Sequence, residues 1–189
     1  MAFDITYKQT TGSTNDDVWE LAQAGAPQGT CVAAFEQTAG RGKWDRVWVG
    51  PRGGLYFSFI LRPTTPVSEW PQMSPAIAEA IAKVVREQTG AGADEVWVKL
   101  PNDVLCHQGK LCGILLEAKE GVVVVGCGLN VFPPETPAQT DGRNVPAYVS
   151  DLGNFVGVTG VDPAKADAHD AYLTALVPKL AASIEEAVL

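Results

Sequence analysis

The spacing of hydrophobic and polar residues in the first third of the chain predicts short strands around one amphipathic helix. The runs "DITYKQT", "TCVAAFEQT" and "GGLYFSFILRP" are rich in β-branched and aromatic residues and predict strands. The segment "STNDDVWELAQAG" instead spaces its apolar residues as a helix does, at Val18, Leu21 and Ala22. Ser13 or Thr14 would cap the first turn of this helix.

The middle of the chain predicts a second helix followed by a meander of strands. Between Pro71 and Gln88, Ile77 and Ile81 fall on one apolar stripe, as in a helix packed on a core. "EVWVKL" then predicts a strand, "DVLCHQGKLCGILLE" a hairpin, and "VVVVGCGLNV" a further strand.

The last part of the chain predicts a loop and then a helix. The segment from Pro133 to Pro146 is rich in Pro, Thr and Gly, and the tail from Asp162 reads as a helix interrupted at Pro178. Together these elements predict one α+β domain, a mixed, mostly antiparallel β-sheet packed with α-helices.

Composition restricts the class of protein further. A chain of 189 residues with 46% hydrophobic residues is long enough for one well-packed domain. Its formal net charge of -8 argues against nucleic acid as a partner, because nucleic-acid recognition needs a basic surface. The start "MAFDITYKQT" resembles no signal peptide, and no apolar run approaches the ~18 residues of a membrane span. We therefore expect a cytoplasmic protein with no membrane partner.

Cysteine and histidine offer little chemistry here. The four cysteines show no CxxC spacing and lie in or beside apolar runs, so we expect buried thiols. His107 and His169 lack the spacing of metal ligands. The sequence therefore predicts no bound transition metal and no histidine general base.

One short connection concentrates positive charge in this acidic chain. From residue 36 to residue 52, four arginines and lysines face two acidic residues, which gives 4 - 2 = +2. Gly40 and Gly42 could let the backbone approach a ligand, with the cations binding carboxylate or phosphate, or the segment could be a solvated loop whose tryptophans belong to the core. Trp44 and Trp48 could supply a stacking face. Asp45 stands where a dinucleotide-binding GxGxxG needs its third glycine, so that fold is excluded.

The remaining features are weak one by one. Lys99 precedes a Pro-Asn-Asp turn and could lie at a pocket edge or simply in solvent. Ser13-Thr14-Asn15 could bind a polar ligand or merely cap a helix. Gly126 and Gly128 lie in a predicted strand, which suggests close approach of another group to the backbone.

In combination, the order and content of these features resemble the catalytic domain of biotin protein ligases, the biotin–[acetyl-CoA-carboxylase] ligases of the biotin/lipoate ligase superfamily. The motifs that carry the resemblance are "STN", "QTAGRGKWDRVW", "GPRGGLYFS", "KLPND", "KLCGILLE" and "GCGLN". The resemblance is close over about residues 3 to 132 and looser in the helical tail. It implies a fold like that of class II aminoacyl-tRNA synthetases.

The resemblance also implies an activity. Such a ligase forms biotinyl-5'-AMP from biotin and ATP, with Mg²⁺ accompanying the nucleotide as substrate and no tightly bound metal. It then transfers biotin to a lysine of a biotin carboxyl carrier protein domain. The oligomeric state stays open, a homodimer included.

Site residues carried over from the family fall into overlapping groups. Those assigned to biotin are Ser13, Thr14, Asn15, Gln37, Gly40, Arg41, Gly42, Lys43 and Lys99. Those assigned to the nucleotide are Arg41, Lys43, Arg46, Trp48, Lys99, Asn102 and Asn130. Lys99 and Arg41 would act in catalysis, by offsetting the charge that builds up where carboxylate meets α-phosphate.

Several positions depart from the family pattern. Lys43 replaces an arginine and loses its forked geometry, while Leu100 replaces a tryptophan. Trp44 and Asp45 stand where a basic or apolar residue and then a glycine are usual, and we expect Asp45 to pair with a neighbouring cation. Neither an N-terminal DNA-binding domain nor a C-terminal SH3-like domain is expected within residues 1–189. Alternatives are a lipoate- or octanoate-type ligase, and a catalytically weak module that binds biotin or nucleotide.

Overall fold

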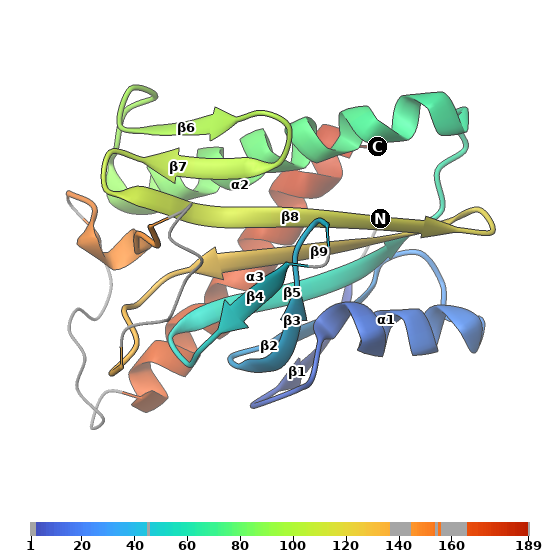
Figure 1. Ribbon diagram of the computed structural model, residues 1–189, viewed down its shortest axis with the longest axis horizontal. Coiled ribbons are helices and arrows are strands. Elements are labelled where there is room, and N and C mark those ends of the chain that lie inside the picture. The colour runs from blue at the N-terminus through green and yellow to red at the C-terminus, as the bar shows by residue number, and fades with distance from the viewer. Residues whose placement is uncertain (1–2, 45, 137–144, 154, 156–165, 189) are drawn as a thin grey trace.

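A single seven-stranded sheet organises the domain (Figure 1). The computed structural model describes residues 3–44, 46–136, 145–153, 155 and 166–188. In spatial order the strands are β1 (Asp4–Lys8), β2 (Thr30–Ala34), β5 (Gly54–Leu61), β9 (Val122–Asn130), β8 (Gly109–Lys119), β7 (Asp103–Cys106) and β6 (Val96–Lys99). Only β1 and β2 pair in parallel, and the other neighbours are antiparallel. The predicted α+β class with a mixed, mostly antiparallel sheet is confirmed.

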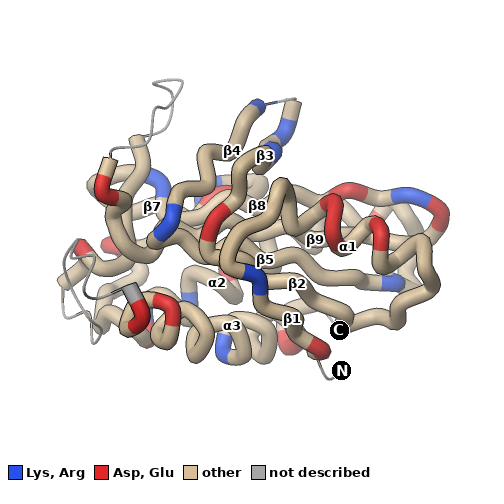
Figure 2. The backbone as a smooth tube through the Cα atoms, turned by 90° about the horizontal axis from the view of Figure 1, so that it is seen from below, with Lys and Arg blue, Asp and Glu red and all other residues tan. Residues whose placement is uncertain are grey.

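Helices cover both faces of this sheet. Figure 2 shows α2 (Met73–Thr89) and α3 (Ala166–Val188) on one side of the sheet, opposite the β3–β4 hairpin. The short helix α1 (Thr14–Gln23) packs on β2, β5 and β9. Two 3-10 turns, η1 (Val67–Gln72) and η2 (Val149–Asp151), complete the described elements.

Strand β5 shows why both faces are covered, because all eight of its residues are buried. Its alternate residues Leu55, Phe57, Phe59 and Leu61 join the large core cluster that includes α2 and α3. Ile60, on the opposite face, packs instead against α1. Because successive side chains of a strand point to opposite faces of the sheet, β5 contributes residues to two separate hydrophobic cores.

The basic connection between β2 and β5 is a structured hairpin, which the sequence did not indicate. Strands β3 (Gln37–Arg41) and β4 (Val47–Gly50) form their own two-stranded sheet. A Cβ on Gly50 would lie 2.8 Å from Cβ of Gln37, so only glycine allows this close pairing. Asp45, whose pairing we predicted, lies outside the described residues, as do residues 137–144 of the predicted loop.

The predicted interruption of the last helix was wrong, because α3 continues through Pro178. Proline lacks the N–H that would bond the carbonyl four residues earlier, that of Thr174. The hydroxyl of Tyr7 donates a hydrogen bond to this Thr174 carbonyl at 3.2 Å. A residue from β1 thus satisfies the group that proline leaves unpaired, and the helix runs on.

The four cysteine thiols are buried and free, as predicted. Burial raises the pKa of Cys31 and of Cys112 to about 12, so both remain protonated at neutral pH. Among the described helices, none combines the length and the apolar character needed to cross a bilayer. Within the same residues, no group of three or more His, Cys, Asp or Glu side chains is placed to hold a metal.

Candidate active site

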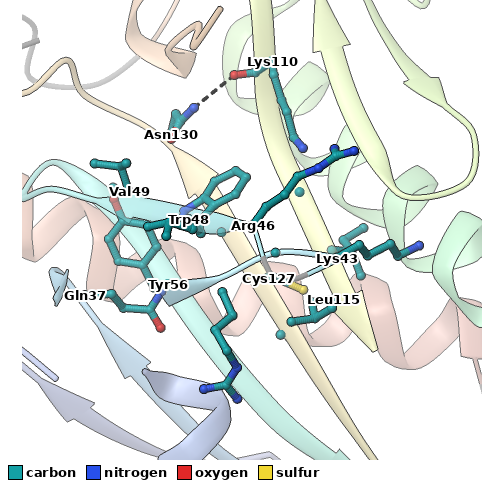
Figure 3. Close-up of a pocket in the computed structure, with 18 of the residues that line it drawn as sticks. Gln37, Lys43, Arg46, Trp48, Val49, Tyr56, Lys110, Leu115, Cys127 and Asn130 are labelled. Atoms are coloured by element: carbon teal, nitrogen blue, oxygen red, sulfur yellow. Dashed lines mark hydrogen bonds between the residues drawn. The ribbon is translucent and has the colours of Figure 1, made fainter. Parts of the chain in front are cut away.

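A cavity of about 620 Å³ lies between the β3–β4 hairpin and the sheet (Figure 3). Its floor consists of residues from β5, β8 and β9, and one wall is the start of α1. The turn between β6 and β7 contributes Pro101, Asn102 and Asp103 to the opposite side. Segments that are far apart in the sequence therefore line one cavity.

Glycines in β8 and β9 create the floor. Gly113 and Gly128 are direct cross-strand partners, and Trp48 from the hairpin packs on both. A Cβ would lie 2.7 Å from the indole ring at Gly113 and 2.6 Å at Gly128. At Gly126 a Cβ would lie 2.0 Å from Oδ1 of Asn15. The "GCGLN" glycines thus leave room for a tryptophan and an amide directly on the sheet.

One end of the cavity is neutral and densely hydrogen-bonded. The Thr14 backbone N–H, free at the helix start, donates to Oε1 of Gln37 at 2.7 Å. The Thr14 hydroxyl lies 2.9 Å from the same oxygen and 2.7 Å from the hydroxyl of Ser58. Ser58 donates to Oδ1 of Asn15 at 2.6 Å. Ser13 takes the predicted N-cap position without a side-chain cap bond.

Beside this neutral end, Arg41 is held by two carboxylates. Its guanidinium bonds Asp16 at 2.7 Å and reaches Glu117 at 3.4 Å. The hydrogen bond to Asp16, together with the charge of Glu117, raises the pKa of Arg41 above its ordinary value. Glu117 also accepts from Nδ2 of Asn15 at 2.7 Å and from Trp19 at 3.3 Å. Arg41 lines the cavity, but two carboxylates already offset its charge.

The opposite end of the cavity is cationic. Lys110 Nζ pairs with Asp103 at 2.8 Å and lies 5.1 Å from the centroid of the Trp48 ring, with only 15% of its side chain exposed. Burial, and then the positive charge of Lys110, lower the pKa of Lys43, while Asp103 acts in the opposite direction. Asp103 pairs with Lys110, so the charge of Lys43 leaves this end positive, which suits a carboxylate or a phosphate.

Asn130 links the two central strands at this end. Its Nδ2 donates to the backbone carbonyl of Lys110 at 3.0 Å, a bond drawn in Figure 3. This bond fixes the start of β8 beside the end of β9 and so positions Lys110. Trp48 Nε1 is buried and finds no hydrogen-bond partner among the residues that the structure describes.

Most of the predicted site residues meet in this cavity. Those that line it are Ser13, Thr14, Asn15, Gln37, Arg41, Gly42, Lys43, Arg46, Trp48, Asn102 and Asn130. Gly40 is not among the lining residues. It lies behind the wall, where a Cβ would meet the Trp48 carbonyl at 2.6 Å.

Lys99 does not reach the cavity, contrary to our prediction. It ends the edge strand β6, and its side chain is exposed and is not part of the lining. Lys110 occupies the place that we expected Lys99 to take. The signal was present in the sequence, because the "KLCGILLE" motif carries its own lysine three residues before Gly113. The register of the strands places Lys99 opposite Asp103 and Lys110 opposite Leu105, so only the side-chain ion pair in the folded protein shows that Lys110 is the partner of Asp103.

A hydrogen-bonding end and a cationic end within one cavity define a site for a ligand with a polar head and an acidic tail. The model of the biotin/lipoate A/B protein ligase family matches residues 7–130, and the chain belongs to this family.

Two curated relatives agree with the family model. The bifunctional ligase/repressor BirA of Bacillus subtilis is 39% identical over 147 residues, which are 71% of this chain and 44% of that protein. The biotin–[acetyl-CoA-carboxylase] ligase of Mycobacterium tuberculosis is 39% identical over 134 residues, or 69% of this chain and 50% of that protein. The chain thus spans about half the length of these relatives.

Solved structures show the same fold. The biotin protein ligase of Aquifex aeolicus in complex with biotin and ATP superposes with a TM-score of 0.76 and 23% identity, over 98% of this chain and 70% of that one. The Leishmania major enzyme in complex with biotinyl-5-AMP gives a TM-score of 0.72 and 24% identity, over 98% and 76%.

Proposed function

We propose that this chain catalyses ATP-dependent protein biotinylation. It would form biotinyl-5'-AMP from biotin and ATP and then transfer biotin to a lysine of a biotin carboxyl carrier domain. The observation that carries this proposal is the joining of the Thr14–Gln37 end and the Lys43–Lys110 end in one cavity. The names of the relatives and the ligands in the related structures support it.

The neutral end would hold the ureido ring of biotin. A cyclic urea carries N–H donors and a carbonyl acceptor, and amide and hydroxyl side chains match both kinds of group. The acyl chain would then lie along the floor beside Trp48. This arrangement directs the carboxylate toward Lys43 and Lys110, at the far end of the cavity from Gln37 (Figure 3).

The cationic end would carry the first chemical step. A carboxylate oxygen attacks the α-phosphorus of ATP, a P–O bond forms, and pyrophosphate leaves with Mg²⁺. Two anions repel each other as they approach, so positive charge at the meeting point lowers the barrier. Lys110, paired with Asp103 and held over Trp48, supplies this charge in place of Lys99.

In the second step the amine of an acceptor lysine attacks the acyl carbon. The C–N bond forms, AMP leaves with the electrons of the mixed anhydride bond, and the amine loses its proton. The mixed anhydride also reacts with water, so the β3–β4 hairpin must cover it until the acceptor arrives. We propose that this reaction takes place in the cytoplasm, where ATP and the carrier would be available.

A direct experiment tests the proposal. The protein is incubated with biotin and Mg-ATP, denatured, and examined by mass spectrometry for biotinyl-AMP. A biotin carboxyl carrier domain is added in a second sample, and its mass should rise by one biotinyl group. Lipoic acid replaces biotin in a matched control. Lipoyl-AMP without biotinyl-AMP would indicate the lipoate-type alternative, and neither product would overturn the proposal.

A further inference from the structure

Ser58 is a polar residue in the most buried strand of the protein. It is 0% exposed, and it is not among the residues that line the cavity. It lies directly opposite Gly126 in the β5–β9 pair, where the missing side chain of glycine leaves a seat for the amide of Asn15. A buried hydroxyl is costly unless it is hydrogen-bonded, so its partners indicate its purpose.

The partners of Ser58 form a row of four oxygens with three close contacts. In order, Asn15 Oδ1 and Ser58 Oγ are 2.6 Å apart, Ser58 Oγ and Thr14 Oγ1 2.7 Å, and Thr14 Oγ1 and Gln37 Oε1 2.9 Å. The two amide oxygens at the ends can only accept hydrogen bonds. Only the two hydroxyls carry protons, so the row has one proton fewer than it has contacts.

Neither amide can turn over to supply the missing proton. Asn15 presents its NH₂ to Glu117 at 2.7 Å, which keeps Oδ1 toward Ser58. Gln37 presents Oε1 to the Thr14 backbone N–H at 2.7 Å, and a turned amide would place its NH₂ against this fixed donor. One of the three oxygen–oxygen contacts must therefore lack a proton, whichever way the hydroxyls point.

The contact between Thr14 and Gln37 is the one that lacks the proton. If Ser58 donates to Asn15 and Thr14 donates to Ser58, both of the shorter contacts are hydrogen bonds. The longest contact is then left without one, at an oxygen that already accepts the Thr14 N–H. The two other arrangements place no proton between Ser58 and Thr14, or none between Asn15 and Ser58, although both of these pairs are closer. The second arrangement also leaves the buried Oδ1 of Asn15 without a hydroxyl donor.

We infer that Ser58 is a positioning residue that turns the Thr14 hydroxyl away from Gln37, so that Gln37 Oε1 keeps a lone pair for an N–H of the ligand head. This inference rests on the proposed function and deepens it. The head site is selective for heads that donate N–H, as both biotin and desthiobiotin do. The dithiolane ring of lipoate has no N–H and gains nothing from this oxygen.

Ser58→Ala tests the inference by calorimetric titration. Without the serine, the Thr14 hydroxyl turns to Gln37 and fills the lone pair. The affinities for biotin and desthiobiotin should each fall roughly tenfold, while that for lipoic acid stays within twofold of the wild type. Ser74→Ala is the matched control, because its buried hydroxyl makes no hydrogen bond with the described residues. It should bind all three ligands as the wild type does.

A double variant separates positioning from packing. Thr14→Val removes the hydroxyl that Ser58 directs, so adding it to Ser58→Ala should cost less than the product of the two single losses. Thermal unfolding of each variant confirms the fold. Losses that multiply, an unchanged biotin affinity in Ser58→Ala, or equal losses for biotin and lipoic acid would each overturn the inference. Failure of the wild type to bind biotin would instead count against the proposed function.

Discussion

The two ends of the cavity differ in almost every physical respect. At the neutral end Thr14, Asn15 and Ser58 are buried, uncharged and bonded to one another. At the cationic end Lys110 pairs with Asp103, and Lys43 adds a further positive charge. A fixed network of hydrogen bonds favours selective binding of a head group. Unbalanced charge favours a reaction between anions, so the first end should control affinity and the second should control rate.

The largest expected effect is at Lys110. Lys110→Ala removes the charge at which carboxylate and phosphate would meet, so single-turnover formation of biotinyl-AMP should slow roughly 100- to 1,000-fold. Biotin affinity should change little, because the head group is bound at the other end. Quenched-flow measurement of biotinyl-AMP, with calorimetry for biotin, checks both statements.

Lys99→Ala is the matched control for that change. It removes the same charge from an exposed position on β6 and should leave the rate within twofold. A slow Lys99→Ala with a normal Lys110→Ala would restore the assignment made from the sequence motif.

The next largest effect is expected on biotin affinity, from a substitution that disrupts the hydrogen bonds of the neutral end. In Gly126→Ala the new methyl group would lie 2.0 Å from Oδ1 of Asn15, so the amide must leave its seat beside Ser58. Biotin affinity should fall roughly 10- to 100-fold, because buried hydrogen bonds are lost. With biotin saturating, the rate of adenylate formation should stay close to that of the wild type. Gly12→Ala, where a methyl group meets nothing within 4 Å, is the control for calorimetry.

Lys43 should show a pH dependence at the cationic end. Its pKa is lowered, so the ammonium is lost as pH rises through a value below that of an ordinary lysine. Adenylate formation should therefore decline in alkaline solution by a few-fold. Lys43→Arg keeps its charge there and should extend the plateau to higher pH. Identical pH profiles for the two proteins would show that Lys43 does not hold the anion.

The smallest expected effect is on stability alone, at a residue that lies outside both ends of the cavity. Tyr7→Phe removes the hydrogen bond to the Thr174 carbonyl that Pro178 leaves unpaired. The free energy of unfolding should fall by about 1 kcal/mol or less, measured by urea denaturation. Biotin affinity and adenylate rate should not change. A loss of biotin affinity here would mean that α3 influences the site.

Patterning along the chain was sufficient for the large sheet and the helices, but not for the β3–β4 hairpin, because the strands of the large sheet are rich in β-branched and aromatic residues. "GGLYFSFILRP" became β5 and "VVVVGCGLNV" became β9, the two strands that supply much of the floor. Pro178 misled the prediction because its missing bond is replaced by Tyr7, which is 171 residues away. No local rule can detect a partner so distant in sequence.

The sequence could predict those site residues whose place in the cavity follows from their motif alone. Gln37 and Asn130 reach the cavity from strand ends, and Lys43 reaches it from the turn that follows β3. Choosing Lys110 over Lys99 required the direction of the two side chains, because the register places Lys99 opposite Asp103 whereas Lys110 forms the ion pair. The shortage of protons at Ser58 required distances between three separate elements. Register and hydrogen-bond geometry are properties of the folded chain.

The separation of the two ends is tested most directly by a double-variant cycle on Gly126→Ala and Lys110→Ala. Biotin affinity and the single-turnover rate of biotinyl-AMP formation are measured on the wild type, both single variants and the double variant. Independent ends predict that the double variant has the affinity of Gly126→Ala and the rate of Lys110→Ala. A Lys110→Ala protein that loses biotin affinity in proportion to its rate would contradict the division of labour between the two ends.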